Sequence, residues 1–526
     1  MRKIVLSSQN NYMSSNRTKK SIINIIAAVS GQSLGIVVAC ATRIVFVKQL
    51  GEVYLGISGL FTSIVGLLSL AELGVGEAIN YKLYKPLAEQ DIEKVNSLMQ
   101  FYMKVYRMIG ISILMIGIIM MPFLRFFLKS SDVSMVNNLY FIFALFLINT
   151  ACSYFYSYKR ALLISDQRRY VVTIYHYTFY CLMNIGQIIV LLYMKNFVWY
   201  LIIMLVCTIF QNILISRKAD KDYPYLASKN IEKIANIDLN EIKKNTLALM
   251  FHKIGSVVVN STDNILASKM IGIVIVGIYS NYLLITSALN TIIAQLFAAV
   301  TASVGNLGVS VGQKESEGVL KKMLFGNFWI TAIVCSGFYA IIDKVISEWF
   351  GSDMILDKKV LICITINLFL YNIRRTAWTF RDAYGLFWYD RYKAIVEAII
   401  NLGLSIILGA KMGLVGILVG TIASTVLTSL WIEPLVLYKY AFEKSSIQYF
   451  QQLLVYSIIT FMCCWICEIV VSYNRIDGML GIIVDGIICV LMTSGIVLIL
   501  NLKKEECIYY LCLGNRIIKK SKYQLF

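Results

Sequence analysis

Long apolar runs constrain the fold of this chain more than any other feature of its sequence. We count about fourteen runs, each long enough to cross a bilayer as an α-helix. They lie near residues 21–47, 53–80, 106–128, 137–158, 170–194, 197–216, 246–268, 271–300, 324–350, 355–376, 387–410, 412–438, 450–472 and 477–501. The chain is 58% hydrophobic and only 15% charged, whereas about a quarter of a soluble domain is charged. We therefore predict an all-α polytopic membrane protein with about 14 transmembrane helices.

Positive charge is distributed unevenly between the two ends of these runs. Most of the 49 Lys and Arg residues fall in the N-terminus, the C-terminus and the loops after even-numbered runs. Because Lys and Arg are enriched in the cytoplasmic loops of membrane proteins, we expect both termini to be cytoplasmic. The net charge of +19 then reflects topology. So apolar a chain excludes a nucleic-acid-binding protein.

The N-terminus and the cysteines do not indicate a secreted or cofactor-binding protein. Residues 1–20 are polar, and the apolar run that begins at Ser21 is longer than the core of a signal peptide. Met1 and Met13 are both candidate start residues. Most of the 12 cysteines lie inside apolar runs and are interpreted as small buried residues. With only 2 histidines in the chain, we expect no metal and no cofactor.

An internal repeat indicates how the runs are organised. The segment from Arg43 to Glu89 contains two runs joined near residues 49–53, which predicts a transmembrane hairpin. A shift of 221 residues places Gly51 and Gly56 on Gly272 and Gly277. Because this shift spans six helices, we predict two parallel six-helix bundles plus two appended helices. The expected parts are a cytoplasmic N-terminal segment (1–20), an N-terminal bundle (21–216), a cytoplasmic loop (217–245), a C-terminal bundle (246–438), the appended helices (450–501) and a cytoplasmic tail (502–526).

Two of the apolar runs carry basic side chains that are candidates for substrate binding. Arg43 lies inside the first run, and His252, Lys253 and Asp263 lie in the seventh. A charge that faces lipid is costly, so these residues are expected to line a water-filled cavity. Two simpler interpretations remain open: Arg43 extends to the outer headgroups, or Lys253 and Asp263 pair with each other.

Arginines also gather between the tenth and eleventh runs. Arg374 and Arg375 end an apolar run, and Arg381 follows among aromatic residues. These guanidinium groups are candidates to receive a phosphate from the inner leaflet. The alternative is an ordinary solvated, positively charged cytoplasmic loop. We expect Lys393 and Glu397, which are four residues apart, to form an ion pair.

Three carboxylates within the runs are candidates for ion coupling. Glu72 and Glu77 lie in the second run, and Glu397 lies in the eleventh. Each could bind a proton or a sodium ion during transport. Each could equally be the structural partner of a neighbouring arginine. Two parallel bundles that face each other suit alternating access, and the cationic candidates favour an anionic substrate.

The amino-acid sequence of the hairpin also resembles that of a known family. The pattern R-x7-G-x2-Y-L-G-x2-G-L-F begins at Arg43, and L-x-E-L-G-x-G-x-A-I-x-Y-x-L-Y-K-P-L-A begins at Leu70. Both resemble the first two helices of Wzx-type polysaccharide flippases, which belong to the multidrug/oligosaccharidyl-lipid/polysaccharide exporter superfamily. The resemblance extends over the first twelve runs.

This resemblance implies a function and a location. It implies a flippase in a bacterial plasma membrane that carries a polyprenyl-pyrophosphate-linked oligosaccharide from the inner to the outer leaflet. The implied partners are membrane lipids, a proton or sodium counter-ion, and the polysaccharide polymerase and glycosyltransferases. The alternative within the superfamily is a cation-coupled drug or metabolite exporter with an acidic cavity. An enzyme such as a membrane polymerase is not expected, because the predicted outer loops are too short for a catalytic site.

Overall fold

The computed structural model describes residues 2–72, 75–132, 135–227, 261–310 and 313–513, together with six positions between 250 and 259. Within these ranges the regular structure is helical, with no β-strand. Eleven helices of the described part are long and apolar enough to cross a membrane, or twelve if one bent pair is a single span. The predicted class, an all-α multi-pass membrane protein, is therefore confirmed.

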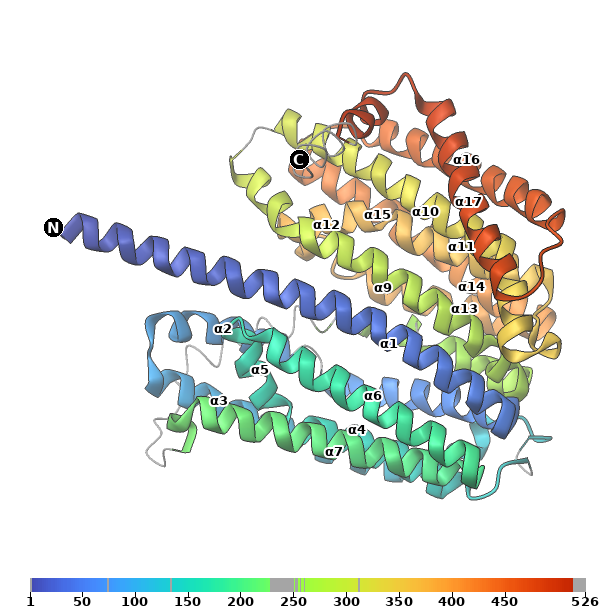
Figure 1. The fold of residues 1–526 in the computed structure, drawn as a ribbon, viewed down its shortest axis with the longest axis horizontal. Helices are drawn as coiled ribbons and strands as arrows, with labels where there is room; N and C mark the ends of the chain where they lie inside the picture. The colour runs from blue at the N-terminus through green and yellow to red at the C-terminus, as the bar shows by residue number, and fades with distance from the viewer. Residues whose placement is uncertain are drawn as a thin grey trace. The chain divides into compact units, whose positions relative to one another are not determined.

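The chain divides into two compact units, residues 1–277 and residues 278–526. The first unit contains α1 (Arg2–Leu68), α2 (Val75–Glu89), α3 (Ile92–Met120), α4 (Leu139–Phe155), α5 (Ser157–Ser165), α6 (Arg169–Met194) and α7 (Phe197–Asp222). The second contains most of α9 (Ile273–Ser310), α10 (Gln313–Phe350), α11 (Lys358–Ile373), α12 (Arg375–Ala383), α13 (Lys393–Met412), α14 (Leu414–Leu427), α15 (Ser429–Leu437), α16 (Ile447–Ser472) and α17 (Gly478–Asn501). Figure 1 labels these helices along the chain.

The predicted opening hairpin is present, although its second leg is broken. The helical path of α1 breaks at Gly51, whose φ of 77° is a backbone conformation that glycine adopts at little cost. The second leg was expected to be continuous over residues 53–80. Instead α1 ends at Leu68, a 3-10 turn (η1) occupies Ser69–Glu72, and α2 begins at Val75. This break places the carboxylate of Glu72 at a helix end, where the backbone has left its regular hydrogen-bond ladder.

The sequence repeat reappears as a pair of equivalent backbone contacts within the first unit. A Cβ atom on Gly56 would lie 2.0 Å from the carbonyl oxygen of Ile273. A Cβ atom on Gly277 would lie 2.2 Å from the carbonyl oxygen of Glu52. The shift of 221 residues converts one contact into the other, since it carries Gly56 to Gly277 and Glu52 to Ile273. Both positions therefore need glycine, because two helices approach there backbone to backbone.

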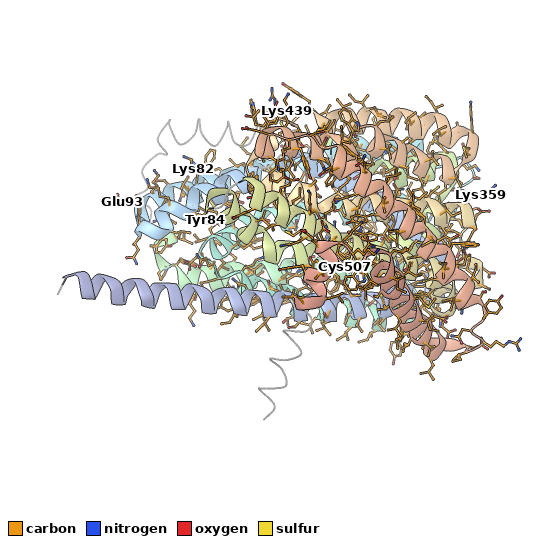
Figure 2. All side chains as sticks on the ribbon, turned by 90° about the horizontal axis from the view of Figure 1, so that it is seen from above. Lys82, Tyr84, Glu93, Lys359, Lys439 and Cys507 are labelled. Atoms are coloured by element: carbon orange, nitrogen blue, oxygen red, sulfur yellow. The ribbon has the colours of Figure 1, made fainter. Side chains whose placement is uncertain are left out.

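The last helix, α17, attaches to α10 through polar contacts. Ser336 and Thr493 share a hydrogen bond of 2.7 Å, and the Lys344 ammonium lies 2.7 Å from the Asp485 carboxylate. Asp485 is fully buried, so this ion pair holds α17 against α10 where a lone charge would be very costly. Lys359, at the start of α11, and Lys439, after α15, lie at opposite ends of the helices of this unit (Figure 2).

We predict that the paired glycine contacts cannot accept a methyl group. Gly56→Ala and Gly277→Ala should each lower the free energy of unfolding by about 1–3 kcal/mol, because a Cβ would collide with a main-chain carbonyl that cannot rotate away. Thermal unfolding of the purified protein in detergent measures this effect. Gly403→Ala is the matched control, since no atom lies within 4 Å of its added Cβ. A melting temperature unchanged in all three variants would contradict the close approach.

Candidate functional site

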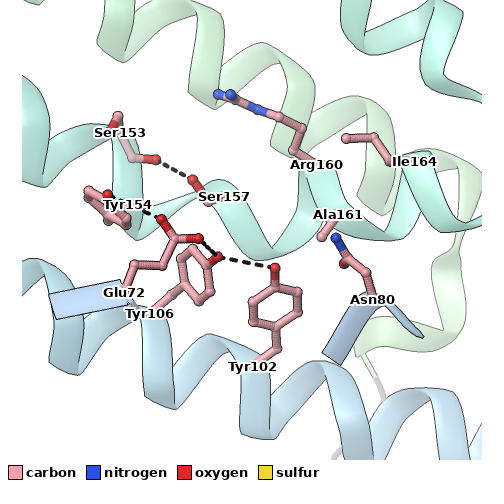
Figure 3. Close-up of a pocket in the computed structure, with 10 residues that line it drawn as sticks. All are labelled: Glu72, Asn80, Tyr102, Tyr106, Ser153, Tyr154, Ser157, Arg160, Ala161 and Ile164. Carbon is pink, nitrogen blue, oxygen red and sulfur yellow. Dashed lines mark hydrogen bonds between the residues drawn. The ribbon is translucent and has the colours of Figure 1, made fainter. Parts of the chain in front are cut away.

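A polar pocket lies inside the first unit, beside two breaks in its helices. Its volume is about 290 Å³. Figure 3 shows its lining, which comes from η1, α2, α3, α4 and α5. The lining residues are Glu72, Asn80, Tyr102, Tyr106, Ser153, Tyr154, Ser157, Arg160, Ala161 and Ile164. Polar groups gathered at helix breaks are typical of the sites of membrane transporters, because irregular backbone at membrane depth must line a cavity or be buried in protein.

The second break is a bend of 45° between α4 and α5. Two serine hydroxyls bond backward to their own helix across it: Ser153 to the carbonyl of Thr150, and Ser157 to that of Ser153, each at 2.7 Å. Such bonds compete with the helical ladder and bend helices. The run predicted over residues 137–158 is therefore the first part of a bent pair, and the bend turns Arg160 into the pocket wall.

Glu72 is the centre of the hydrogen bonding in this pocket. The hydroxyl of Tyr106 donates to its Oε1 at 2.6 Å, and the hydroxyl of Tyr154 donates to its Oε2 at 3.2 Å. The hydroxyl of Tyr102 lies 3.3 Å from that of Tyr106 and 3.4 Å from the carbonyl oxygen of Gly76. Figure 3 shows the carboxylate between the rings of Tyr106 and Tyr154. Two phenols thus solvate a carboxylate that would otherwise be costly to hold at a helix end inside a membrane protein.

Gly76 on α2 allows the tyrosines to come this close. A Cβ atom at this position would lie 2.2 Å from the Tyr106 hydroxyl and 2.9 Å from Oε1 of Glu72. Any larger residue would push the phenol out of hydrogen-bond reach. The G-x-G pattern at residues 74–76 therefore has a packing reason at its second glycine.

Arg160 and Asn80 bring unused hydrogen-bonding capacity to the pocket. The Nη2 group of Arg160 donates to Oδ1 of Asn212 at 2.7 Å, which fixes the guanidinium group. Its Nε is buried and has no partner in the described part of the chain, and the same is true of Oδ1 of Asn80. A buried donor and a buried acceptor in one pocket are a costly arrangement unless a ligand or water satisfies them.

The remaining predicted residues of the first unit are only partly described. Arg43 is half-buried on α1 and interacts electrostatically with Tyr180, Tyr200 and Cys40. Asp263 is half-buried in the helical stretch 261–270 and also interacts with other residues. His252 and Lys253 lie outside the described residues, as does the side chain of Glu77. That Arg43 and Lys253 line one water-filled cavity stays a prediction.

In the second unit, two of the three predicted arginines, Arg374 and Arg381, belong to a network around Glu433. Arg374 donates to both carboxylate oxygens of Glu433, at 2.8 and 3.2 Å, and the Lys393 ammonium donates to the same group. Arg381 lies 3.9 Å from Glu433 and pairs with Asp390 at 2.5 Å. Glu433, Arg381 and Asp390 are all buried. Arg374 and Arg381 are therefore engaged with carboxylates, and their predicted role as phosphate ligands stays a prediction.

Two details of this region differ from expectation. The expected pair between Lys393 and Glu397 does not form, because Lys393 turns to Glu433. Glu397 instead accepts hydrogen bonds from Thr425 at 3.1 Å and from Ser429 at 2.5 Å. Helical spacing brought Lys393 and Glu397 near each other, but Glu433 offers Lys393 a more buried carboxylate shared with arginines. Arg375 lies over the ring of Tyr371, 5.2 Å from its centroid.

Comparison with known proteins gives a fold. No protein-family model matches the sequence, and no curated protein matches it. A solved structure of the lipid II flippase MurJ, in an inward closed conformation, matches 91% of this chain and 99% of its own, with a TM-score of 0.63 and 18% identity. The chain has the fold of a transporter of the MOP superfamily.

Two structures of multidrug resistance transporters support the same conclusion. A MATE family transporter of the MOP superfamily matches 78% of this chain and 98% of its own in its inward-facing conformation, with a TM-score of 0.60 and 15% identity. An outward-facing MATE structure matches 78% of this chain and 93% of its own, with a TM-score of 0.51 and 15% identity. The matched proteins are a flippase and transporters, not enzymes.

The sequence indicated Glu72 but not its partners. Tyr102, Tyr106 and Tyr154 lie in apolar runs, where a tyrosine is indistinguishable from the other aromatic residues by hydropathy alone. Their spacing held a usable signal: Tyr102 and Tyr106 are four residues apart and therefore share a helix face. Arg160 was also missed, because it follows the predicted end of the fourth run.

We predict that Glu433 is essential to the stability of the second unit. Glu433→Gln should lower the free energy of unfolding by about 3–5 kcal/mol, because it removes the buried carboxylate closest to both Arg374 and Lys393. Among the described residues, the carboxylates that remain near them are more distant: Glu397, 3.9 Å from Arg374, and Asp390, 3.3 Å from Lys393. Thermal or denaturant unfolding of the purified protein measures this. Glu443→Gln, at an exposed carboxylate, is the control and should change little. Equal stability of the two variants would contradict a network centred on Glu433.

Proposed function

We propose that this protein is a flippase that moves a polyprenyl-pyrophosphate-linked oligosaccharide from the inner to the outer leaflet of a bacterial plasma membrane. The observation that carries the proposal is the likeness of fold to the lipid II flippase, which extends over 99% of that chain. The resemblance of the opening hairpin to Wzx-type flippases supports an oligosaccharide headgroup. That the chain is a multi-pass membrane protein with a transporter fold does not depend on this proposal.

The chemistry of the first unit suits such a headgroup. A sugar presents many hydroxyl groups, each of which donates and accepts hydrogen bonds. The pocket offers the Glu72 carboxylate and Asn80 Oδ1 as acceptors and the buried Nε of Arg160 as a donor. A diphosphate requires cations, which Arg43 and Lys253 would supply. If the diphosphate carries negative charge outward, an inside-negative membrane potential assists by about 2.3 kcal/mol per charge per 100 mV.

The proposed transport cycle uses two bundles that move against each other. We propose that residues 21–216 and 246–438 form these bundles and that the segment 217–245, whose first residues continue α7 to Asp222, connects them. The lipid tail would stay in the bilayer while the headgroup crosses. Ion coupling would use an acidic residue within the spans, for which Glu72, Glu77 and Glu397 are the candidates.

A drug exporter is the alternative, favoured by the likeness to MATE structures at a TM-score of 0.60. Such an exporter would carry a cationic compound and would need a predominantly acidic site. The pocket here combines one carboxylate with a buried guanidinium group, which favours a substrate with both donors and acceptors. Transport of a lipophilic cation by reconstituted protein, without transport of a lipid-linked sugar, would establish the alternative. Glycosyltransferase and polymerase genes beside this gene would favour the flippase.

We predict that cationic residues of the first unit are needed for transport. Arg43→Ala and Lys253→Ala should each reduce flipping of a fluorescent polyprenyl-diphosphate sugar about tenfold, because each loses one charge-assisted contact with the diphosphate. Reconstituted vesicles with a membrane-impermeant quencher measure the rate. Lys503→Ala removes an exposed lysine and serves as the control. Wild-type rates in both test variants would exclude these residues from substrate binding.

We also predict the topology. In a cysteine-free background, Ser228→Cys in the 217–245 loop should react with an impermeant maleimide only from the cytoplasmic side. Arg475→Cys, in the exposed turn between α16 and α17, should react only from outside. These assignments follow from the uneven distribution of Lys and Arg. The reverse labelling pattern would invert the proposed orientation.

A further inference from the structure

Glu72 accepts hydrogen bonds from Tyr106 and Tyr154, and the contacts continue from Tyr106 to Tyr102 and from Tyr102 to the carbonyl of Gly76, in an order that allows Glu72 to gain and lose a proton. We propose that Glu72 is the proton-binding residue of the transport cycle, and that Tyr106 and Tyr102 form a relay that satisfies its hydrogen bonds in both protonation states. This inference rests on the proposed transport function for its role in coupling, although proton binding itself can be measured without transport.

The ionised state follows directly from the observed distances. A carboxylate only accepts hydrogen bonds, and each phenol has a single hydrogen to donate. Tyr106 therefore donates to Oε1 at 2.6 Å and Tyr154 to Oε2 at 3.2 Å. Since the hydrogen of Tyr106 is used, the contact of 3.3 Å with Tyr102 requires Tyr102 to be the donor. In this state the hydroxyl hydrogens of all three tyrosines point toward Glu72 along the series of hydrogen bonds.

The protonated state uses the same oxygen atoms with the hydrogens reversed. When Oε1 of Glu72 takes up a proton from solution, its O–H donates to the oxygen of Tyr106. Tyr106 then donates to Tyr102, and Tyr102 donates to the carbonyl of Gly76, which already lies 3.4 Å away. Tyr154 continues to donate to Oε2. No covalent bond other than the new O–H forms, and each of the three hydrogen bonds of the ionised state is kept or reversed, while Tyr102 gains one to the carbonyl of Gly76.

The packing around the relay keeps these atoms within reach. Tyr102 and Tyr106 are 2% and 4% exposed, and their rings meet edge to face at 4.5 Å. The absence of a Cβ on Gly76 lets α2 present its carbonyl to Tyr102. A buried tyrosine whose ring is fixed can change the direction of its hydrogen bond only by rotating its hydroxyl hydrogen. The change of protonation state is therefore possible without moving a helix.

The groups that face Glu72 favour a proton over a metal cation. They are Tyr102 and Tyr106 from α3, Tyr154 from α4, Asn80 from α2 and Arg160 from α5. Arg160 is the charged side chain among these lining residues, and its positive charge opposes a proton and a sodium ion alike, so it does not decide between them. In the described part of the chain, no group of three or more His, Cys, Asp or Glu residues is placed to hold a metal ion. A hard cation needs several oxygen ligands, and both carboxylate oxygens of Glu72 already accept hydrogens from phenols, an arrangement that suits a proton better.

Proton binding at this residue would be linked to substrate binding in the same pocket. An ionised carboxylate has about four acceptor positions, so two remain for sugar hydroxyls after the phenols are counted. Protonation removes an acceptor and part of the attraction for donors. A proton and a hydroxyl-rich headgroup would therefore weaken each other's binding, as an exchange mechanism requires.

Infrared difference spectroscopy of the purified full-length protein tests the relay. A carboxylic acid C=O band should appear as pH is lowered and should be absent in Glu72→Gln. Tyr102→Phe should lower the proton affinity about tenfold, because Tyr106 then lacks an acceptor in the protonated state only. Tyr154→Phe should raise the proton affinity, because it removes a hydrogen bond that is stronger to the charged carboxylate than to the neutral acid. Glu89→Gln, at an exposed carboxylate of α2, is the control and should leave the Glu72 band unchanged.

Opposite shifts of the proton affinity of Glu72 in Tyr102→Phe and Tyr154→Phe distinguish a relay from a structural role. A structural role would shift the proton affinity in the same direction in both variants. Thermal unfolding of each variant confirms that it is folded. The relay is overturned if wild type and Glu72→Gln give the same spectrum, or if Tyr102→Phe leaves the titration unchanged. Flipping that persists in that case leaves the proposed function intact. A titrating band in a protein that flips no lipid-linked sugar would overturn the proposed function and leave the proton site standing.

Discussion

Every polar group of this chain that lies at membrane depth must find its partner within the protein, because the hydrocarbon offers none. This constraint explains why the structure is helical throughout its described spans and why departures from the helix are few. The breaks at η1 and between α4 and α5 are two such departures, and both adjoin the pocket that contains Glu72. Broken backbone, polar side chains and a cavity therefore occur together.

The two units satisfy their buried charges in different ways. Around Glu433, two arginines and a lysine meet two buried carboxylates, so the charges largely compensate each other. Such a network stabilises an arrangement but has little capacity left for a ligand. Around Glu72 the partners are neutral phenols, and Arg160 and Asn80 keep a buried donor and a buried acceptor without partners in the described residues. In the described part of the second unit, buried polar atoms without partners also occur, Arg375 Nε among them, but the pocket beside Glu72 brings a carboxylate, a donor and an acceptor together, so we place the proposed site in the first unit.

Glycine determines how closely helices and side chains approach in this molecule. At Gly56 and Gly277, it brings main chains within contact distance, and the two contacts are equivalent under the sequence repeat. At Gly76, the absence of a Cβ allows the hydroxyl of Tyr106 to pack against α2. In a membrane the hydrophobic effect does not drive helix association, so close packing of this kind carries more of the energy. The same small residue thus supports both the architecture and the relay.

The sequence by itself determined the membrane class, the hairpin that turns at Gly51, the repeat of 221 residues, and the presence of charged residues such as Arg43 and Glu72 within spans. These features follow from local composition and residue spacing, because the burial of apolar residues depends directly on both. Only the tertiary structure decided the partners. Glu72 accepts hydrogen bonds from tyrosines of α3 and α4. Lys393 pairs with Glu433, forty residues away, and not with Glu397 on its own helix. The physical reason is that a buried charge pairs with the most complementary group that packing brings near it, and packing depends on contacts between residues far apart in the chain.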